Sequence, residues 1–319
     1  MRFLVMGAGA IGSVFGGFLR RAGHDVTLVG QHRAHMAAIA EAGLKISGIW
    51  GDHRIGDFRT FESVARTAGE PFDAVFLSVK SYDTEPAMAQ LIEARLEGEP
   101  PVVSLQNGLG NIETIARFVG AGRTIGGRVI FGVELVEPGH CRVTVYAEEV
   151  MLGAFECDAV PPETIETLAA TLKEAGIPTL ATDRIHAYIW GKILYNCCLN
   201  PTATLLGTHY GELAEHEQTR AIVQQVVREI YAVAAARGID LLQPTGDAYL
   251  DLLFGRLIPA TYDHHPSMLQ DIRAGRRTEI DAMNGAVARY GRESAVPTPT
   301  NELLTLLIKA LERPSRRPS

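Results

Sequence analysis

A glycine-rich segment, Gly7–Gly12, constrains the fold more than any other feature of the sequence. It stands between the apolar run Phe3–Met6 and a helix-forming stretch, Ile11–Ala22, which is the context in which a GxGxxG pattern becomes informative. There the first glycine permits a tight turn, the second lets a pyrophosphate approach the backbone, and the third allows close packing of helix on strand. The helix N-terminus adds unpaired N–H groups for the phosphates. We therefore predict a dinucleotide-binding βαβ unit, with cofactor contacts at Gly7, Ala8, Gly9, Ala10, Ile11 and Gly12.

The first half of the chain continues this alternation of strands and helices. Three further runs of strand length, Asp25–Val29, Ala74–Val79 and Pro101–Leu105, are rich in apolar residues and are separated by amphipathic stretches. Continuous apolar strands are typical of a parallel sheet covered on both faces. Residues 128–155 change to closely spaced β-rich runs, of which Cys141–Tyr146 alternates like an antiparallel strand. These patterns predict an α/β domain.

The second half is helical in pattern, and strand signals end at about residue 182. A length of 319 residues exceeds the usual limit of one hydrophobic core, about 250–300 residues, so we expect two domains, 1–182 and 183–319. Within the second domain Pro201 is expected to kink or end its helix. The basic, proline-broken segment 313–319 is read as a frayed end in preference to a binding arm. Helix-period apolar residues cover 184–199, 218–237, 244–253, 267–290 and 300–311.

Composition excludes several classes of protein. The net charge of −7 argues against a general nucleic-acid binder. The 4 cysteines form no CxxC and no Cys/His ligand spacing, so we expect no disulfide framework and no metal site. No apolar run reaches the roughly 18 residues that a membrane span needs. The N-terminus lacks the long apolar stretch of a signal peptide, so we expect a cytoplasmic protein without membrane partners.

The end of the second strand bears on the choice of nicotinamide cofactor. NAD sites usually carry an acidic residue there, which binds the ribose 2′-hydroxyl. This strand ends instead in Val29-Gly30-Gln31-His32-Arg33, without a carboxylate. Arg33 is available for a 2′-phosphate, so we predict NADP(H), with Gln31 and Arg33 near the ribose. The alternative for Arg33 is a solvated charge at the start of a helix.

Polar residues follow two other predicted strands. Asn107 comes directly after Pro101–Leu105, and Lys80 follows Ala74–Val79. Ligands of open α/β sheets bind at the carboxyl ends of the strands, so both residues are candidates for cofactor and substrate binding. The alternatives are an ordinary Asn-Gly turn for Asn107 and a charge that closes a buried strand for Lys80.

Lys192, Asn196 and Asn200 are spaced i, i+4 and i+8 in a predicted helix and therefore project from one face. They present one ammonium group and two amides among apolar neighbours. Such a stripe is costly to bury unless it has a purpose, so it is a candidate site. The alternative is the solvent-facing side of an amphipathic helix.

Ser267 and Glu279 are further candidates in the second half. Ser267 with Gln270 has the spacing of a capping box, which is a structural role, although its hydroxyl could also reach a ligand at the helix mouth. Glu279 lies close in sequence to Arg273, Arg276 and Arg277, so its alternative role is an ion pair on a helix surface.

Taken together, these motifs resemble the ketopantoate reductase (2-dehydropantoate 2-reductase) family, a branch of the 6-phosphogluconate-dehydrogenase-like proteins. The resemblance runs over nearly the whole chain and in family order. It implies a Rossmann-type N-terminal domain followed by an all-α C-terminal domain. The motifs are GAGAIG at 7–12, SVK at 78–80, LQNGLG at 105–110, WGKILYNCCLNP at 190–201, SMLQDI at 267–272 and TEID at 278–281.

The resemblance also implies roles at matching positions. Lys192 is similar to the general acid of the family, and Asn107 to the amide that touches both cofactor and substrate. Asn196, Asn200 and Ser267 resemble its substrate-binding residues, and Glu279 its carboxylate near the cofactor and the substrate hydroxyl. In one departure, Gln31 stands where many relatives carry a basic residue.

The expected activity is the NADPH-dependent reduction of 2-dehydropantoate to pantoate, a step towards pantothenate and coenzyme A. Hydride delivery to a ketone builds negative charge on oxygen, which a protonated Lys192 can stabilise and then quench. The alternatives are a paralogous reductase of another 2-oxo acid and a non-catalytic NADP(H) sensor, which would need neither Lys192 nor Glu279. Substrate is expected between the two domains, where water is excluded. A homodimer is possible.

Overall fold

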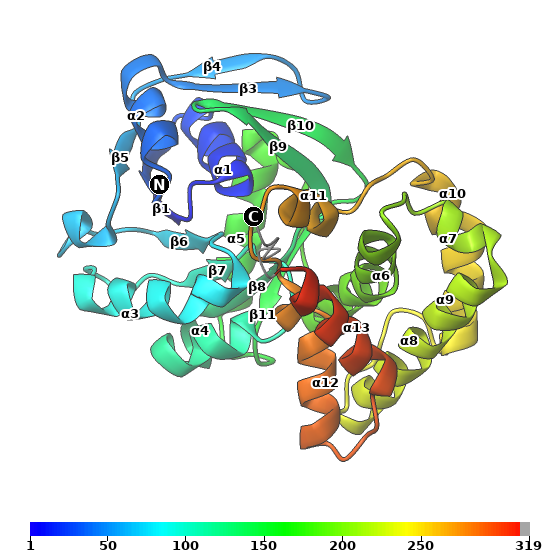
Figure 1. The fold of residues 1–319 in the computed structure, drawn as a ribbon. Helices are drawn as coiled ribbons and strands as arrows, with labels where there is room; N and C mark the ends of the chain where they lie inside the picture. The colour runs from blue at the N-terminus through cyan, green and yellow to red at the C-terminus, as the bar shows by residue number, and fades with distance from the viewer. Residues whose placement is uncertain (313–319) are drawn as a thin grey trace. The chain divides into compact units, whose positions relative to one another are not determined.

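The computed structural model describes residues 1–312, which are drawn as a ribbon in Figure 1. The chain divides into two compact units: the first is Met1–Ile185, and the second begins at His186. The expected frayed end at 313–319 lies outside the described residues. No helix within 1–312 combines the length and the apolarity needed to cross a bilayer.

Within residues 1–312, the first unit contains an eight-stranded sheet in the order β12-β11-β8-β7-β6-β1-β2-β5. Neighbouring strands are parallel except β8 and β11, which pair antiparallel. The strands are β1 (Arg2–Met6), β2 (Asp25–Val29), β5 (Arg59–Phe61), β6 (Ala74–Leu77), β7 (Val102–Ser104), β8 (Thr124–Arg128), β11 (Val150–Ala154) and β12 (Thr179–Ala181).

Helices cover both faces of this sheet because its strands are apolar on both sides. In β1, Phe3 and Val5 join one hydrophobic cluster with α1 and α5, whereas Leu4 and Met6 join the other with α3 and α4. This alternation is the two-residue period of a strand. The predicted Rossmann-type architecture is therefore confirmed (Figure 1). The helices are α1 (Ala10–Arg21), α2 (Arg33–Ala42), α3 (Thr84–Ala94), α4 (Asn111–Val119) and α5 (Pro162–Ala175).

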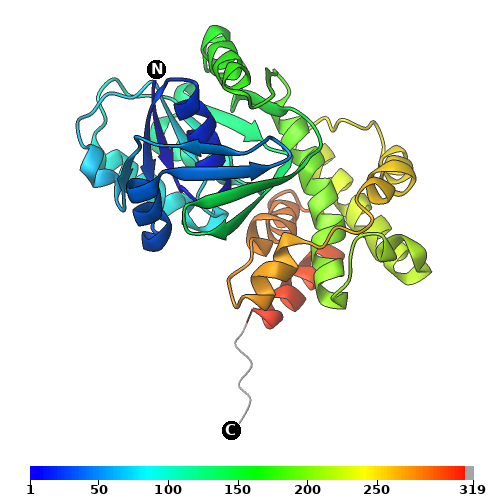
Figure 2. The same cartoon turned by 90° about the horizontal axis from the view of Figure 1, so that it is seen from above.

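A second sheet, in the order β4-β3-β10-β9, packs on the outer side of α1 (Figure 1); Figure 2 views it from above. Two adjacent glycines allow α1 to fit between the sheets. A Cβ at Gly16 would lie 2.6 Å from Leu28 of the large sheet, and one at Gly17 would lie 2.6 Å from Ile46 of the small sheet. The strands are β3 (Leu44–Gly48), β4 (His53–Ile55), β9 (Phe131–Glu137) and β10 (His140–Tyr146).

The second unit is all-α as predicted, since no strand follows Ala181 in the described part of the chain. The long α8 buries one face, as its apolar period predicts, whereas α6 is buried or half-buried along almost its whole length. The short α9 continues through a π turn, 253–257, into α10. The helices are α6 (Ile185–Leu206), α7 (Glu212–Glu215), α8 (Glu217–Ala236), α9 (Gly246–Leu252), α10 (Ile258–Ala260), α11 (Ser267–Arg273), α12 (Asn284–Glu293) and α13 (Pro299–Leu311).

Two helix predictions were wrong. The expected single helix over 267–290 is broken into α11, a 3-10 turn at Ile280–Ala282, and α12. The break follows from Gly275, whose φ of +65° lies in the left-handed region that ends helices. Pro201 does not end its helix, since α6 continues through it to Leu206. The side chain of Asn284, from another part of the unit, makes this possible because it donates a hydrogen bond to the Cys197 carbonyl oxygen. That Pro201 kinks the helix stays a prediction.

Candidate active site

The turn between β1 and α1 is built around Gly7. Its φ is +96°, and a Cβ added there would lie 2.4 Å from the backbone nitrogen of Val79, so only glycine fits. The Gly7 N–H donates to the Val29 carbonyl oxygen at 2.8 Å, and the Ser78 hydroxyl donates to the Gly7 carbonyl oxygen at 2.9 Å. The turn is thus held by hydrogen bonds to the ends of β2 and β6, the strands on either side of β1 in the sheet.

The start of α1 is open in the way that a pyrophosphate requires. Gly9 is the N-cap residue and has no side chain, so no N-cap side chain accepts a hydrogen bond from the first N–H groups of the helix. A Cβ at Gly9 would meet only the Gly7 carbonyl oxygen, at 3.9 Å, whereas one at Gly12 would clash with that oxygen at 2.5 Å. Gly9 therefore leaves room for a ligand and Gly12 permits close packing. Residues 7–12 fit a dinucleotide on the geometry of this loop.

The remaining first-unit candidates lie at the same edge of the sheet. β7, β6, β1 and β2 are adjacent and parallel, so the segments after them share the carboxyl edge. Asn107 follows β7 and is half-buried, and Lys80 follows β6 and is exposed. Gln31 and Arg33 follow β2, and both are exposed. The strand order reverses direction at β1, which makes this edge the topological switch point where such sheets bind ligands.

Gln106 is a positioning residue that sequence reasoning missed. Its Nε2 donates to the Val79 carbonyl oxygen at 3.0 Å and to the Thr84 hydroxyl at 2.7 Å, which ties the end of β7 to the end of β6. The carbonyl oxygen of Asn107 accepts a hydrogen bond from Asn111 Nδ2 at 2.8 Å. The local loop around Asn107 is therefore ordered by two side-chain amides, a feature that the Asn-Gly pattern alone does not reveal.

Glu62 is a second residue that the sequence analysis did not consider. It lies just beyond β5, next to β2 in the sheet, and its Oε2 is 3.0 Å from Nε of Arg33. The only usable signal was its place after the strand Arg59–Phe61, and that short strand was not predicted. A carboxylate is thus present near the end of β2, although the residues that directly follow β2 supply none.

The three candidate site residues of α6 differ in exposure. Lys192 and Asn196 are half-buried, and Asn200 is only 4% exposed. Because none of the three is fully exposed, the reading of a solvent-facing stripe does not fit. Asn200 is bonded inside its own unit: its Oδ1 accepts a hydrogen bond from the Tyr210 hydroxyl, and its Nδ2 lies 3.8 Å from the sulfur of Met283. Its contact with substrate remains a prediction.

Apolar and aromatic groups surround the α6 residues. Cys197 and Cys198 are fully buried, and burial raises the pKa of Cys198 beyond the normal range, so neither thiol is a nucleophile. Tyr195 bonds to the Thr261 hydroxyl at 2.7 Å, and burial raises its pKa to about 12. Among these neighbours the Lys192 ammonium is the group suited to proton transfer.

Ser267 and Glu279 occupy different settings. The capping-box reading of Ser267 is wrong, because Pro266 is the N-cap of α11 and no side chain caps it; Ser267 is the exposed first residue of the helix. Glu279 is only 7% exposed and precedes the turn Ile280–Ala282, so it does not lie on a helix surface. Met283, just after that turn, contacts Asn200 of α6. The Glu279 segment is thereby fastened to α6.

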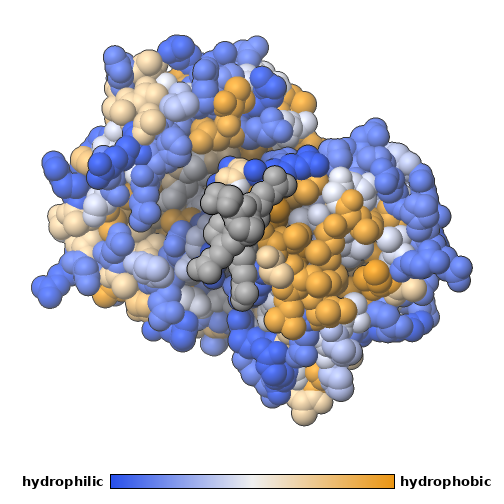
Figure 3. All heavy atoms as spheres, viewed as in Figure 1, coloured by the Kyte–Doolittle hydropathy of each residue, from blue (hydrophilic) through white to orange (hydrophobic). Residues whose placement is uncertain are grey.

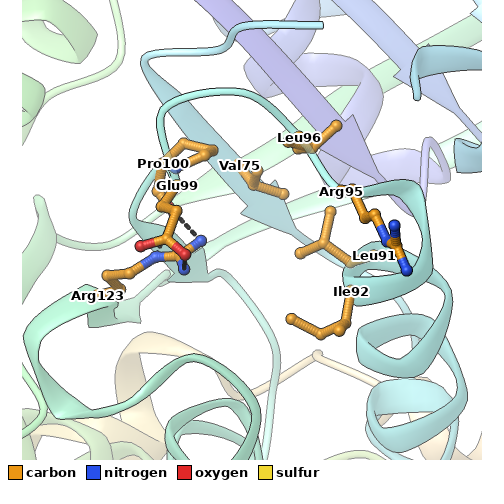
Figure 4. A pocket seen from close by; sticks show the side chains of 8 residues that line it. All are labelled: Val75, Leu91, Ile92, Arg95, Leu96, Glu99, Pro100 and Arg123. Atoms are coloured by element: carbon orange, nitrogen blue, oxygen red, sulfur yellow. Dashed lines mark hydrogen bonds and ion pairs between the residues drawn. The ribbon is translucent and has the colours of Figure 1, made fainter. Parts of the chain in front are cut away.

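A separate pocket lies at the opposite edge of the large sheet (Figure 4). It is lined near the start of β6 by Val75 and near the end of α3 by Leu91 and Arg95. Arg123 donates to the Pro100 carbonyl oxygen there, at 3.2 Å from Nη2. None of the predicted site residues lines this pocket. Within residues 1–312 no group of three or more His, Cys, Asp or Glu side chains could hold a metal ion.

Residues 3–156 match the family described as ketopantoate reductase PanE/ApbA, and residues 184–312 match its C-terminal counterpart, ketopantoate reductase PanE/ApbA C terminal. The chain belongs to the ketopantoate reductase family. A curated 2-dehydropantoate 2-reductase of Aquifex aeolicus is 39% identical over 98% of this chain and 97% of its own length.

Solved structures agree with this assignment. The 2-dehydropantoate 2-reductase of Geobacter metallireducens is 30% identical, with a TM-score of 0.88 over 97% of this chain and 99% of that one. A D-mandelate dehydrogenase solved with NADH and anilino(oxo)acetate is 29% identical, with a TM-score of 0.85 over 98% of both chains. The same fold is therefore shared by proteins named for different substrates, 2-dehydropantoate and D-mandelate.

Proposed function

We propose that this chain is an NADP-dependent oxidoreductase that reduces 2-dehydropantoate to pantoate in pantothenate biosynthesis. The observation that carries the proposal is the chain-long match to 2-dehydropantoate 2-reductases, with Lys192 half-buried on α6 beside buried apolar residues. A regulatory nucleotide sensor would need the glycine turn but would have no use for that lysine.

When bound, NADPH would supply a hydride to the keto carbon of the substrate, with a C–H bond of the dihydronicotinamide broken as the new C–H bond forms, and would be left as NADP⁺. The electron pair of the C=O π bond moves to oxygen, which then needs a proton. Lys192 is the proposed general acid: its ammonium hydrogen-bonds the keto oxygen and delivers the proton as negative charge develops there. The ordinary pKa of a lysine side chain is about 10.4, so at neutral pH this residue type carries the proton that a general acid needs.

Neutral donors complete the substrate site. Asn196 and Ser267 of the second unit and Asn107 of the first are proposed to hydrogen-bond the carboxylate and hydroxyl of the substrate, and Asn200 is kept in this set. Glu279 is proposed to act near the cofactor and the substrate hydroxyl.

The cofactor residues are proposed from the first unit. Gly7, Ala8, Gly9, Ala10, Ile11 and Gly12 would hold the pyrophosphate at the start of α1. Gln31 and Arg33 would face the adenosine ribose, and Lys80 and Asn107 would extend the site along the carboxyl edge of the sheet.

Substrate identity is tested by following NADPH oxidation with purified protein against several 2-oxo acids. We expect the highest kcat/KM with 2-dehydropantoate. The resemblance to D-mandelate dehydrogenase makes an aromatic 2-oxo acid such as benzoylformate the most informative competitor. Preference for benzoylformate would replace the substrate but keep the reaction class, and failure with every 2-oxo acid would reject the proposed function.

Location and assembly are also part of the proposal. We place the enzyme in the cytoplasm, which agrees with the unpaired thiols of Cys141, Cys157, Cys197 and Cys198. A homodimer remains a prediction. Figure 3 shows apolar surface on the second unit, and α13 exposes Leu303, Leu306, Leu307 and Leu311. Sedimentation of the full chain would measure the oligomeric state.

A further inference from the structure

The carboxylate that β2 lacks at its end is placed there by the neighbouring strand. β2 and β5 are parallel, with Val29 opposite Phe61, and the Gly30 N–H donates to the Phe61 carbonyl oxygen at 3.0 Å. The backbone pairing therefore fixes Glu62 beside the residues that follow β2. In dinucleotide-binding sheets this is the region that receives the adenosine ribose.

Glu62 forms an ion pair with Arg33, the cation expected to meet a 2′-phosphate. The distance from Arg33 Nε to Glu62 Oε2 is 3.0 Å, and the two side chains are 83% and 56% exposed. An exposed pair of this kind contributes little to stability, so a ligand can break it at small cost. Arg33 begins α2, where the helix dipole disfavours a cation, so the helix itself gives no reason for an arginine here.

Two other arginines near the end of β5, Arg59 and Arg66, make different contacts and do not take the place of Arg33 as the partner of Glu62. Arg59 lies over the Phe61 ring at 5.5 Å but is engaged by Glu70, with Nη1 and Nη2 at 2.6 and 2.7 Å from its carboxylate oxygens. Arg66 lies over the same ring at 5.6 Å. Arg33 is therefore the cation that the structure pairs with Glu62.

We propose that Glu62 is a specificity-determining residue that limits the preference of this enzyme for the 2′-phosphorylated cofactor. The proposal rests on the proposed function, because it needs a dinucleotide at this edge. A 2′-phosphate must displace Glu62 from Arg33 and is repelled by the carboxylate. A free 2′-hydroxyl can instead donate a hydrogen bond to Glu62, as it does to the acidic residue of an NAD site.

The test uses binding to the full chain without turnover. Calorimetric titrations with 2′,5′-ADP and with 5′-AMP measure the contribution of the 2′-phosphate directly. In Glu62→Gln we expect about three- to tenfold tighter binding of 2′,5′-ADP and unchanged or weaker binding of 5′-AMP. NADPH and NADH should follow the same order. Glu166→Gln removes the same charge from an exposed site on α5, which packs against β12 at the far end of the strand order from β5, and should change neither affinity.

A double-mutant cycle tests whether Glu62 acts on cofactor affinity through Arg33. In an Arg33→Ala background, Glu62→Gln should change the ratio of the two affinities less than it does in the unmodified chain, because the competition for the guanidinium has been removed and only the direct effects of the carboxylate on the ribose substituent remain. The inference is overturned if Glu62→Gln leaves the ratio of the affinities for 2′,5′-ADP and 5′-AMP as it is in the unmodified chain. It is also overturned if Glu166→Gln changes that ratio as much as Glu62→Gln does. If the unmodified chain binds neither nucleotide nor NADPH, it is the proposed function that fails.

Discussion

The side-chain amide of Asn284 donates a hydrogen bond to the backbone carbonyl of Cys197, with 3.2 Å between Nδ2 and the oxygen. In a regular helix that carbonyl would accept from the N–H of the residue four positions later, which here is Pro201 and has none. Asn284 thus replaces the missing backbone donor. This contact explains why α6 continues through its proline and keeps Lys192 and Asn196 on the same helix as Asn200.

Replacing Asn284 by Ala should therefore destabilise the second unit by about 2–3 kcal/mol, because it leaves buried acceptors without a donor. In a Pro201→Ala background, the restored N–H should reduce that cost by about 1 kcal/mol. Denaturation followed by Trp190 fluorescence in a Trp50→Phe variant reports on the second unit. Equal costs in both backgrounds would show that Asn284 acts through another contact, such as its bond to Asn301 Oδ1 at 3.0 Å.

Gly7→Ala provides a test of the glycine turn with a matched control. Gly7 and Gly23 have nearly the same φ, +96° and +92°, but a Cβ at Gly7 meets backbone atoms at 2.4 Å and one at Gly23 meets nothing within 4 Å. Both variants share the strain of an alanine at positive φ, about 1–2 kcal/mol. Only Gly7→Ala should lose further stability and weaken NADPH binding by tenfold or more. Equal NADPH affinities in the two variants would contradict the proposed phosphate site.

Lys192→Ala tests the mechanism. A general acid contributes about 10²–10⁴-fold, so kcat should fall by that order, whereas the dissociation constant of NADPH should change little. Lys173→Ala, on the exposed side of α5, removes the same charge and should leave kcat unaltered. Turnover by Lys192→Ala within threefold of the unmodified chain would reduce Lys192 to a structural residue.

Local patterns predicted the parts of this protein whose contacts are close in sequence. The glycine turn, the apolar strands and the all-α second half could be predicted because periodicity and glycine conformation act over a few residues. Pro201 and the 267–290 segment were misjudged for opposite reasons. A distant amide rescues the proline, whereas a left-handed glycine breaks a periodic stretch. Glu62 was missed because its significance depends on the pairing of β5 with β2, which one sequence does not display.

A buried histidine links α1 and α2, the helices before and after β2 in the chain. The Gly139 N–H donates to His35 Nδ1 at 2.9 Å, so the proton lies on Nε2, which donates to the Ser13 hydroxyl at 2.9 Å. The imidazole is fully buried. Burial, with a smaller contribution from His32, lowers its pKa to about 4. His35 thus joins α2, α1 and the β9–β10 turn only while it is neutral.

The first unit should consequently lose stability as the pH falls. The folded-state pKa of His35, about 4, lies below the ordinary value of 6.5, so the unfolded chain binds the proton more readily between these values. The stabilisation is complete above pH 6.5 and is lost towards pH 4, by at most about 3 kcal/mol. His24 also has a lowered pKa, so the comparison is with His35→Gln. Urea denaturation followed by Trp50 fluorescence, in a Trp190→Phe background, should show a shallower pH dependence in that variant. The same slope with and without His35 would show that the acid sensitivity comes from other groups.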